Sequence, residues 1–239
     1  RRGGMQTPTA ASDVFQATAS LTGARQNGDT ITTTLDHADW HFARRTGTSY
    51  AGYNQSRITG WNYLMTDAGD AEASATLKQG GDQNKLEYTG SWHNADNDVI
   101  DYFWKRARSF LDIVTWTGTG SDMNISHNLG VVPEMIWARP RSYADHWSVF
   151  HKDATYDLKL DTDAAEGTGT AFGTLTSSVM PVTGGLKVSS HTYIAFLFAT
   201  AAGVSKVGTY TGNGSSQNID CGFSGGNGAS FVMIKNIDA

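Results

Sequence analysis

The sequence predicts an all-β protein made of tandem, small antiparallel β-sandwich or jelly-roll-like domains of about 95 residues each. Three observations predict this class: an internal repeat, short runs rich in β-branched and aromatic residues, and glycine-containing turns between those runs. Glycine accounts for 27 residues and proline for only 4, a mixture that suits short strands joined by tight turns. No segment keeps a helical period over about three turns, so long helices are not expected.

The internal repeat sets the domain organisation. Residues 116–121 (WTGTGS) recur as residues 210–215 (YTGNGS), 94 positions further on, and the same spacing relates residues 64–72 (LMTDAGDAE) to 158–166 (LKLDTDAAE). After a two-residue insertion, the run at 133–139 recurs at 229–235. The sequence therefore predicts four parts, which are an N-terminal extension at 1–13, a divergent unit 1 at 14–108, a unit 2 at 109–202, and an incomplete third unit at 203–239, here called the C-terminal segment.

Within unit 2 the alternation of apolar and polar residues predicts specific strands. They are expected at 111–117, 123–126, 135–139, 147–151 and, as a fully buried strand, 193–199. Residues 205–235 are expected to repeat the strand–turn–strand–strand pattern of 111–139, and residues 22–44 to resemble both. Three short strands alone leave an unpaired edge. The C-terminal segment is thus expected to complete a sheet in a neighbouring unit or subunit, unless the natural chain continues beyond Ala239.

Composition and charge exclude several classes of protein. The formal net charge is −5 and no basic block is longer than a pair, which argues against nucleic-acid binding. Cys221 is the single cysteine, so an intrachain disulfide framework and a multi-cysteine zinc site are excluded. No apolar stretch approaches the roughly 18 residues of a membrane span.

One segment carries a family resemblance. The run from Phe110 to Arg141 (FLDIVTWTGTGSDMNISHNLGVVPEMIWARPR), with SHNLGVVPEM at 126–135, resembles a repeat domain of unknown function found in virion structural and tail-fibre-type proteins of marine tailed phages. The resemblance implies a virion location, homo-oligomers and other virion proteins as partners. The family has no established catalytic residues, so the resemblance assigns none here.

Repeated carboxylates are the first candidate site. Asp67 and Glu72 recur as Asp161 and Glu166, with Asp163 close by. Oxygen-rich loops of this kind can bind calcium, whereas a retaining glycosidase needs two carboxyl groups about 5 Å apart in a cleft. Because an active site seldom needs a duplicate, capping or solvated turn positions are the favoured interpretation. Calcium stays open as a ligand, no other cofactor is predicted, and the protein is not expected to be an enzyme.

Aromatic residues in polar surroundings are the second candidate site. Trp61, Tyr63, Trp92 and His93 lie beside asparagine residues, where exposed rings can stack on sugars. Packing between subunits would use the same residues. The sequence therefore predicts a non-enzymatic virion structural protein, with a carbohydrate-binding host-attachment module as the alternative and a glycan-degrading tailspike as a third option.

Overall fold

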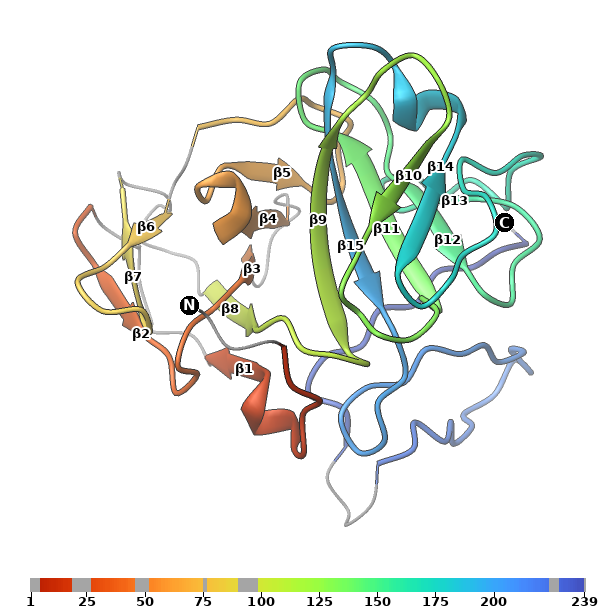
Figure 1. The fold of residues 1–239 in the computed structure, drawn as a ribbon. Helices are drawn as coiled ribbons and strands as arrows, with labels where there is room; N and C mark the ends of the chain where they lie inside the picture. The colour runs from red at the N-terminus through yellow and green to blue at the C-terminus, as the bar shows by residue number, and fades with distance from the viewer. Residues whose placement is uncertain are drawn as a thin grey trace.

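The computed structural model describes residues 5–18, 27–45, 52–74, 77–89, 99–223 and 228–238. Over these ranges the protein consists of β-strands in antiparallel sheets, with short 3-10 helices η1 (Ala11–Asp13), η2 (Arg57–Thr59) and η3 (Gly184–Lys187) (Figure 1). The predicted all-β class is confirmed.

Unit 1 contributes two sheets. A five-stranded sheet has the order β1-β8-β3-β4-β5 and a three-stranded sheet the order β2-β7-β6. The strands are β1 (Phe15–Thr18), β2 (Thr30–Thr32), β3 (Trp40–Arg45), β4 (Tyr53–Ser56), β5 (Tyr63–Met65), β6 (Leu77–Gln79), β7 (Lys85–Tyr88) and β8 (Val99–Trp104).

Unit 2 contributes two further sheets. Its five-stranded sheet has the order β13-β12-β11-β15-β9, and β10 pairs with β14. The strands are β9 (Leu111–Thr117), β10 (Met123–Ser126), β11 (Met135–Pro140), β12 (Ser148–His151), β13 (Leu158–Lys159), β14 (Val179–Val182) and β15 (Thr192–Phe198).

The two five-stranded sheets match strand for strand. Read from the other edge, β9, β15, β11, β12 and β13 take the places of β1, β8, β3, β4 and β5. The register matches as well, because Trp40 lies opposite Trp104 in unit 1 and Met135 lies opposite Phe198 in unit 2. These pairs are related by the 94- and 95-residue spacings of the sequence repeat.

The four sheets stack in layers (Figure 1). Buried apolar residues fill the space between β2-β7-β6 and the first five-stranded sheet, and a second cluster fills the space between β10-β14 and the other. The two five-stranded sheets pack against each other through a third cluster, here called the aromatic interface. In it Trp40 stacks on Trp104 with ring centroids 4.0 Å apart and meets Phe196 of unit 2 at 5.0 Å.

This layering explains the apolar run of β15. Tyr193, Ala195 and Leu197 face the β10-β14 layer, while Ile194 and Phe196 face unit 1. A strand with both faces covered cannot alternate with polar residues, so the sequence reads as a continuous hydrophobic run.

The C-terminal segment differs from the prediction. Its described residues, 203–223 and 228–238, form no named strand, whereas strand–turn–strand–strand was expected. In unit 2 the inner strand β15 pairs with both β9 and β11, and residues 203–239 contain no counterpart of it. Backbone groups without a neighbouring strand cannot form a ladder. Val232 and Ile234 consequently remain 62% and 65% exposed.

The helices of the described ranges are all short. None of them is long and apolar enough to cross a membrane.

Candidate functional site: the contacts that join the units

A buried arginine of unit 2 is enclosed by backbone carbonyls. From β11, the Nη1 atom of Arg139 donates to the oxygen of Met65, the last residue of β5, at 3.1 Å, and to that of Ala68, in the loop that follows, at 2.9 Å. Its Nη2 atom donates to the oxygens of Asp70 and Asp145. The residue is fully buried, so these bonds replace its hydration and tie unit 2 to unit 1.

Carboxylates and an aromatic ring surround this guanidinium. Burial lowers the pKa of Arg139, and the carboxylates of Asp161, Asp145 and Asp70 oppose that shift. The ring of Trp147 lies 5.2 Å from the guanidinium carbon, within the range of a cation–π contact. Trp147 also donates from Nε1 to the oxygen of Met65 at 2.8 Å, so one carbonyl is held by both residues.

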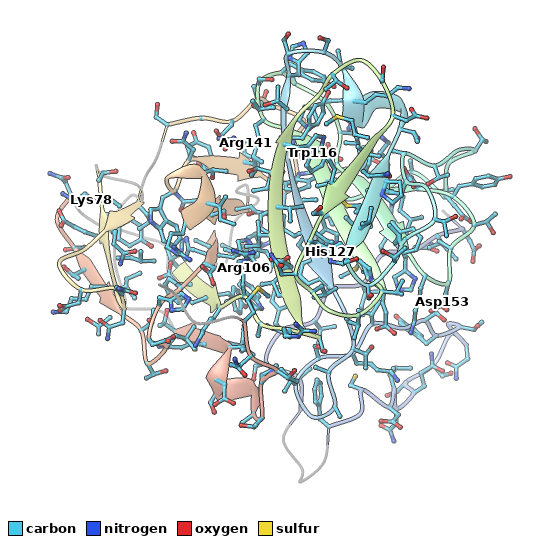
Figure 2. The ribbon with its side chains drawn as sticks, in the orientation of Figure 1. Lys78, Arg106, Trp116, His127, Arg141 and Asp153 are labelled. Carbon is cyan, nitrogen blue, oxygen red and sulfur yellow. The ribbon has the colours of Figure 1, made fainter. Side chains whose placement is uncertain are left out.

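Glu72, one of the repeated carboxylates, joins the units directly. Its side chain receives two hydrogen bonds from Arg141, which Figure 2 labels, at 2.8 and 2.7 Å. Two parallel bonds of this kind are typical of strong ion pairs. Its backbone N–H donates to the oxygen of Arg141 at 2.8 Å. The amide nitrogen of Asn62 donates to the same carboxylate at 3.2 Å. The structure thus gives this predicted site residue a docking role.

The remaining calcium candidates form no common metal-binding cluster among the described residues. Asp161 accepts from the ring of exposed His146 at 2.8 Å and from the N–H of Trp147 at 3.2 Å, and Glu166 accepts from the N–H of Tyr156. Asp67 lines a groove between the units, described below. In the part of the chain that the structure describes, Asp163 and the other candidates join no group of three or more His, Cys, Asp or Glu side chains able to hold a metal ion.

Of the aromatic candidates, the structure describes Trp61 and Tyr63. Trp61 is 3% exposed and belongs to the core between the unit 1 sheets, so its ring presents no face to a sugar. It follows Gly60 and has a positive φ of 67°, a turn geometry that the polar neighbours did not reveal. Tyr63 is half-buried and meets Tyr53 edge to face at 4.7 Å. Trp92 and His93 lie outside the described residues.

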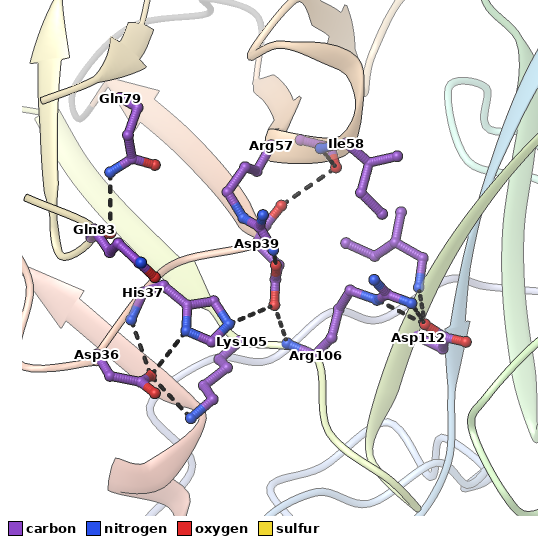
Figure 3. A network of polar contacts seen from close by, with 12 residues as sticks. Asp36, His37, Asp39, Arg57, Ile58, Gln79, Gln83, Lys105, Arg106 and Asp112 are labelled. Atoms are coloured by element: carbon purple, nitrogen blue, oxygen red, sulfur yellow. Dashed lines mark hydrogen bonds and ion pairs between the residues drawn. The ribbon is translucent and has the colours of Figure 1, made fainter. Parts of the chain in front are cut away.

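An acid–cation pair at the start of β3 was missed by the sequence analysis. Asp39 is 2% exposed and accepts from Arg57, from His37 and from the backbone N–H of Arg106 (Figure 3). Burial raises the pKa of Asp39, but the bonds from His37, the Arg106 N–H and Arg57 outweigh burial and bring it to about 2.

The same arrangement recurs in unit 2. Glu134, 95 positions after Asp39, accepts from the ammonium group of Lys152 at 2.9 Å and from the N–H of Thr200 at 2.7 Å. Lys152 itself stands 95 positions after Arg57. The 95-residue spacing of like charges was a signal that could have found this pair.

Arg106 continues the network into unit 2. Its Nε atom donates to Asp112 on β9 at 2.7 Å (Figure 3). Asp112 is fully buried and its second oxygen accepts from the N–H of Asn128 at 2.6 Å. Arg106 thereby links Asp39 of unit 1, through its backbone, to Asp112 of unit 2, through its side chain.

Unit 1 also holds a polar cluster between its two sheets. The ring of His41 lies 2.8 Å from Asp101 and 3.1 Å from Gln55, and the hydroxyl of Tyr88 donates to Asp101 at 2.8 Å. All four residues are fully buried. The cluster has no opening to solvent, so it serves packing between the sheets and is not accessible to a ligand.

Fold and contacts together define an all-β protein of several antiparallel sheets, in which charged residues hold strands and sheets to one another. Residues 89–239 match a domain of unknown function, DUF7483, and the chain belongs to this family. The match covers β8, all of unit 2 and the C-terminal segment. No curated protein and no solved structure matches the chain.

Proposed function

We propose that this chain is a non-enzymatic structural protein of a phage virion, a tail fibre or tail-associated component built from tandem copies of one domain. The observation that carries the proposal is the use made of the recurring ionisable residues. Asp39 and Glu134 fix the start of β3 and β11, and Glu72 ties unit 1 to unit 2. A binding or catalytic role would leave such side chains free to contact a ligand, whereas here they form hydrogen bonds within the protein.

The tandem-domain part of the proposal is supported by topology. Each unit has a five-stranded sheet with the same strand order and a smaller sheet covering one face. In the smaller sheets Ile31 lies opposite Leu86 and Ile125 lies opposite Met180. Ile125 stands 94 positions after Ile31, and Met180 stands 94 positions after Leu86. Two copies of one domain of about 95 residues account for both matches.

Assembly with further copies or other virion proteins is supported by the exposed apolar residues. Val232, Met233 and Ile234 form a consecutive run that is 62%, 40% and 65% exposed. Contiguous apolar surface of this kind is typical of sites that other chains cover. The virion location itself is supported by the resemblance of residues 110–141 to tail-fibre-type proteins.

Two measurements test the non-enzymatic structural role. Incubation with host-type polysaccharides should release no reducing ends, and Asp161→Ala and Glu166→Ala should alter stability alone. Turnover that either substitution abolishes would overturn the proposal. Electron-microscope images of purified particles, with antibody against this chain, should place it on the tail, and labelling of the capsid alone would contradict the tail assignment.

Carbohydrate binding is a second candidate, favoured by the half-buried pair of Tyr63 and Tyr53 on neighbouring strands. Aromatic pairs at a sheet edge can stack on sugar rings. A glycan-array signal that Tyr63→Ala or Trp92→Ala removes without loss of folding would support it. No signal for the unaltered protein would exclude it.

A further inference from the structure

The C-terminal segment begins as unit 2 begins. The N–H of Leu111 donates to the oxygen of Ala107 at 3.1 Å, and 94 positions later the N–H of Ser205 donates to the oxygen of Ala201 at 2.9 Å. Both turns form an isolated antiparallel bridge between their first and last residues. Within the turns, Ser109 and Gly203 have positive φ values of 58° and 71°. The chain therefore leaves unit 2 through the same turn by which it left unit 1.

The segment also contacts unit 2 in the way that unit 2 contacts unit 1. The N–H of Glu72 in unit 1 donates to the oxygen of Arg141, and the N–H of Glu166 in unit 2 donates to the oxygen of Ile237 at 3.1 Å. The two donors are 94 positions apart and the two acceptors 96, the spacing found in the sequence after the two-residue insertion. One backbone hydrogen bond is thus repeated at both junctions.

The cations at the two junctions correspond in the same way. Lys235 stands 96 positions after Arg139. Its Nζ atom donates to the oxygens of Thr162, at 3.0 Å, and Ala164, at 2.7 Å, in the unit 2 loop that follows β13. Arg139 donates to the unit 1 loop that follows β5. Each loop presents backbone oxygens as hydrogen-bond acceptors. A cationic side chain can therefore donate to these oxygens whatever side chains the loop carries.

An aromatic anchor completes the contact. Phe231 packs edge to face against Trp104 at 5.2 Å and Tyr102 at 5.3 Å. Residues 229–235 line a groove of about 450 Å³ together with Phe42, Tyr102 and Leu160, which belong to both units. Phe231 and Ile237 are the partly buried apolar residues of the segment's last part.

We propose that residues 231–237 correspond, in a third copy of this domain, to residues 135–141 of unit 2, which are here called the junction strand. The loop at 160–166 is then a docking surface for such strands. The partner that fits this surface is the junction strand of a following copy. That strand carries a cation at the position of Arg139 or Lys235 and an accessible backbone oxygen two positions later. The inference rests on the tandem-domain part of the proposed function and is independent of the virion location and of enzymatic activity.

Hydrogen exchange in the full-length chain tests this contact. The amide of Glu166 should exchange about fivefold faster in Lys235→Ala, since the lost charge-assisted bonds loosen the strand that protects it. The amide of Glu72, which the same substitution does not touch, should exchange at an unchanged rate. A fluorophore on the single cysteine, Cys221, should show lower anisotropy in the same variant as the segment gains mobility.

Two variants separate docking from general effects of charge. Lys206→Ala removes an exposed lysine of the same segment and should leave the Glu166 amide unchanged. Lys235→Arg should keep the protection, because a guanidinium can reach the same oxygens. Equal exchange at Glu166 in Lys235→Ala and in the unaltered chain would overturn the proposal, as would an effect of Lys206→Ala equal to that of Lys235→Ala.

The kind of partner is tested with a peptide of residues 133–141, which contains the junction strand of unit 2. Added in excess to full-length Lys235→Ala, it should restore protection of the Glu166 amide. The same peptide with Arg139→Ala should not. A failure of the unaltered peptide to protect this amide would overturn the claim that the surface accepts junction strands of other copies, whereas glycan turnover or a capsid location would leave it standing.

Discussion

The interiors of the two units share one architecture and differ in chemistry. In unit 1 the space between the sheets holds a hydrogen-bonded cluster of His41, Gln55, Asp101 and Tyr88. In unit 2 the equivalent positions are apolar, and they are Ile136, Phe150, Ala195 and Val182. Both sets sit on matching strands in matching register, His41 opposite Gln55 and Ile136 opposite Phe150.

The comparison shows that strand register in these two sheets does not depend on an apolar interior. A polar cluster is tolerated because its members provide donors and acceptors for one another, and burial without such partners would be costly. Once one member becomes polar the others must follow as a set. The two units therefore diverge in sequence while the strand order stays the same.

The largest expected effect comes from breaking the polar set. Asp101→Ala should lower the free energy of unfolding by about 3 to 5 kcal/mol, because it leaves His41 and Tyr88 buried without their shared acceptor. Ala195→Asp, the reverse substitution at the equivalent position of unit 2, should lower the free energy of unfolding by at least as much. Urea unfolding followed by circular dichroism measures both. Replacing all four residues by their unit 2 counterparts should recover at least half of the loss, and a loss below about 1 kcal/mol in Asp101→Ala would show that the set is not required.

The next effect distinguishes two arginines at equivalent positions. Arg139→Ala should lower the free energy of unfolding by about 3 kcal/mol, since buried carbonyl oxygens lose a charged donor. Arg44, 95 positions earlier, is exposed, and Arg44→Ala should cost below about 0.5 kcal/mol. Thermal unfolding of the two variants side by side gives the comparison. Equal losses would mean that the enclosure of Arg139 by carbonyls contributes nothing beyond an exposed arginine.

The free energy of unfolding should depend on pH through Asp39. Its pKa is about 2 in the folded protein, against about 3.9 for an unfolded chain. The depressed pKa contributes about 2 kcal/mol that is fully present above pH 4 and is lost as the pH falls through 2. The difference in unfolding free energy between the unaltered chain and Asp39→Asn should therefore shrink by about this amount from pH 5 to pH 2. A constant difference would contradict the assignment.

The equivalent acid of unit 2 should show the smallest effect. The side chains of Glu134 and Lys152 are 26% and 35% exposed, so solvent screens their attraction. Glu134→Ala should cost below about 1 kcal/mol, less than Asp39→Ala in the same urea titration. The reverse order would show that burial does not decide the strength of this repeated pair.

Much of the fold could be predicted because its signals are local. The strand at 123–126 and the strand at 111–117 were predicted with the bounds they have, and the buried run at 193–199 is found as 192–198. Alternation, glycine turns and a continuous apolar run each depend on a few neighbouring residues. The repeat spacing added long-range information, since it predicted which strands occupy equivalent positions in the two five-stranded sheets.

The functional contacts were harder to predict because their partners are distant in sequence. Glu72 was recognised as a recurring acid, yet its partner Arg141 lies 69 residues away and nothing near either residue indicates the pairing. Trp61 was interpreted as exposed from its polar neighbours, whereas the positive φ of Gly60 and Trp61 turns the indole into the core. Asp39 could have been found, because both it and Arg57 have counterparts of like charge 95 positions later.

The aromatic interface has an optical consequence. Of the 7 tryptophans, Trp40, Trp104, Trp137 and Trp147 belong to the buried layer between the units. Trp40 and Trp104 stack at 4.0 Å, close enough for their electronic transitions to couple. Intrinsic fluorescence therefore reports mainly on whether the two units are in contact, and exciton circular dichroism on whether β3 and β8 remain paired. Separation of the units would shift the emission to longer wavelength, whereas the exciton signal of Trp40 and Trp104 would persist as long as β3 and β8 stayed paired.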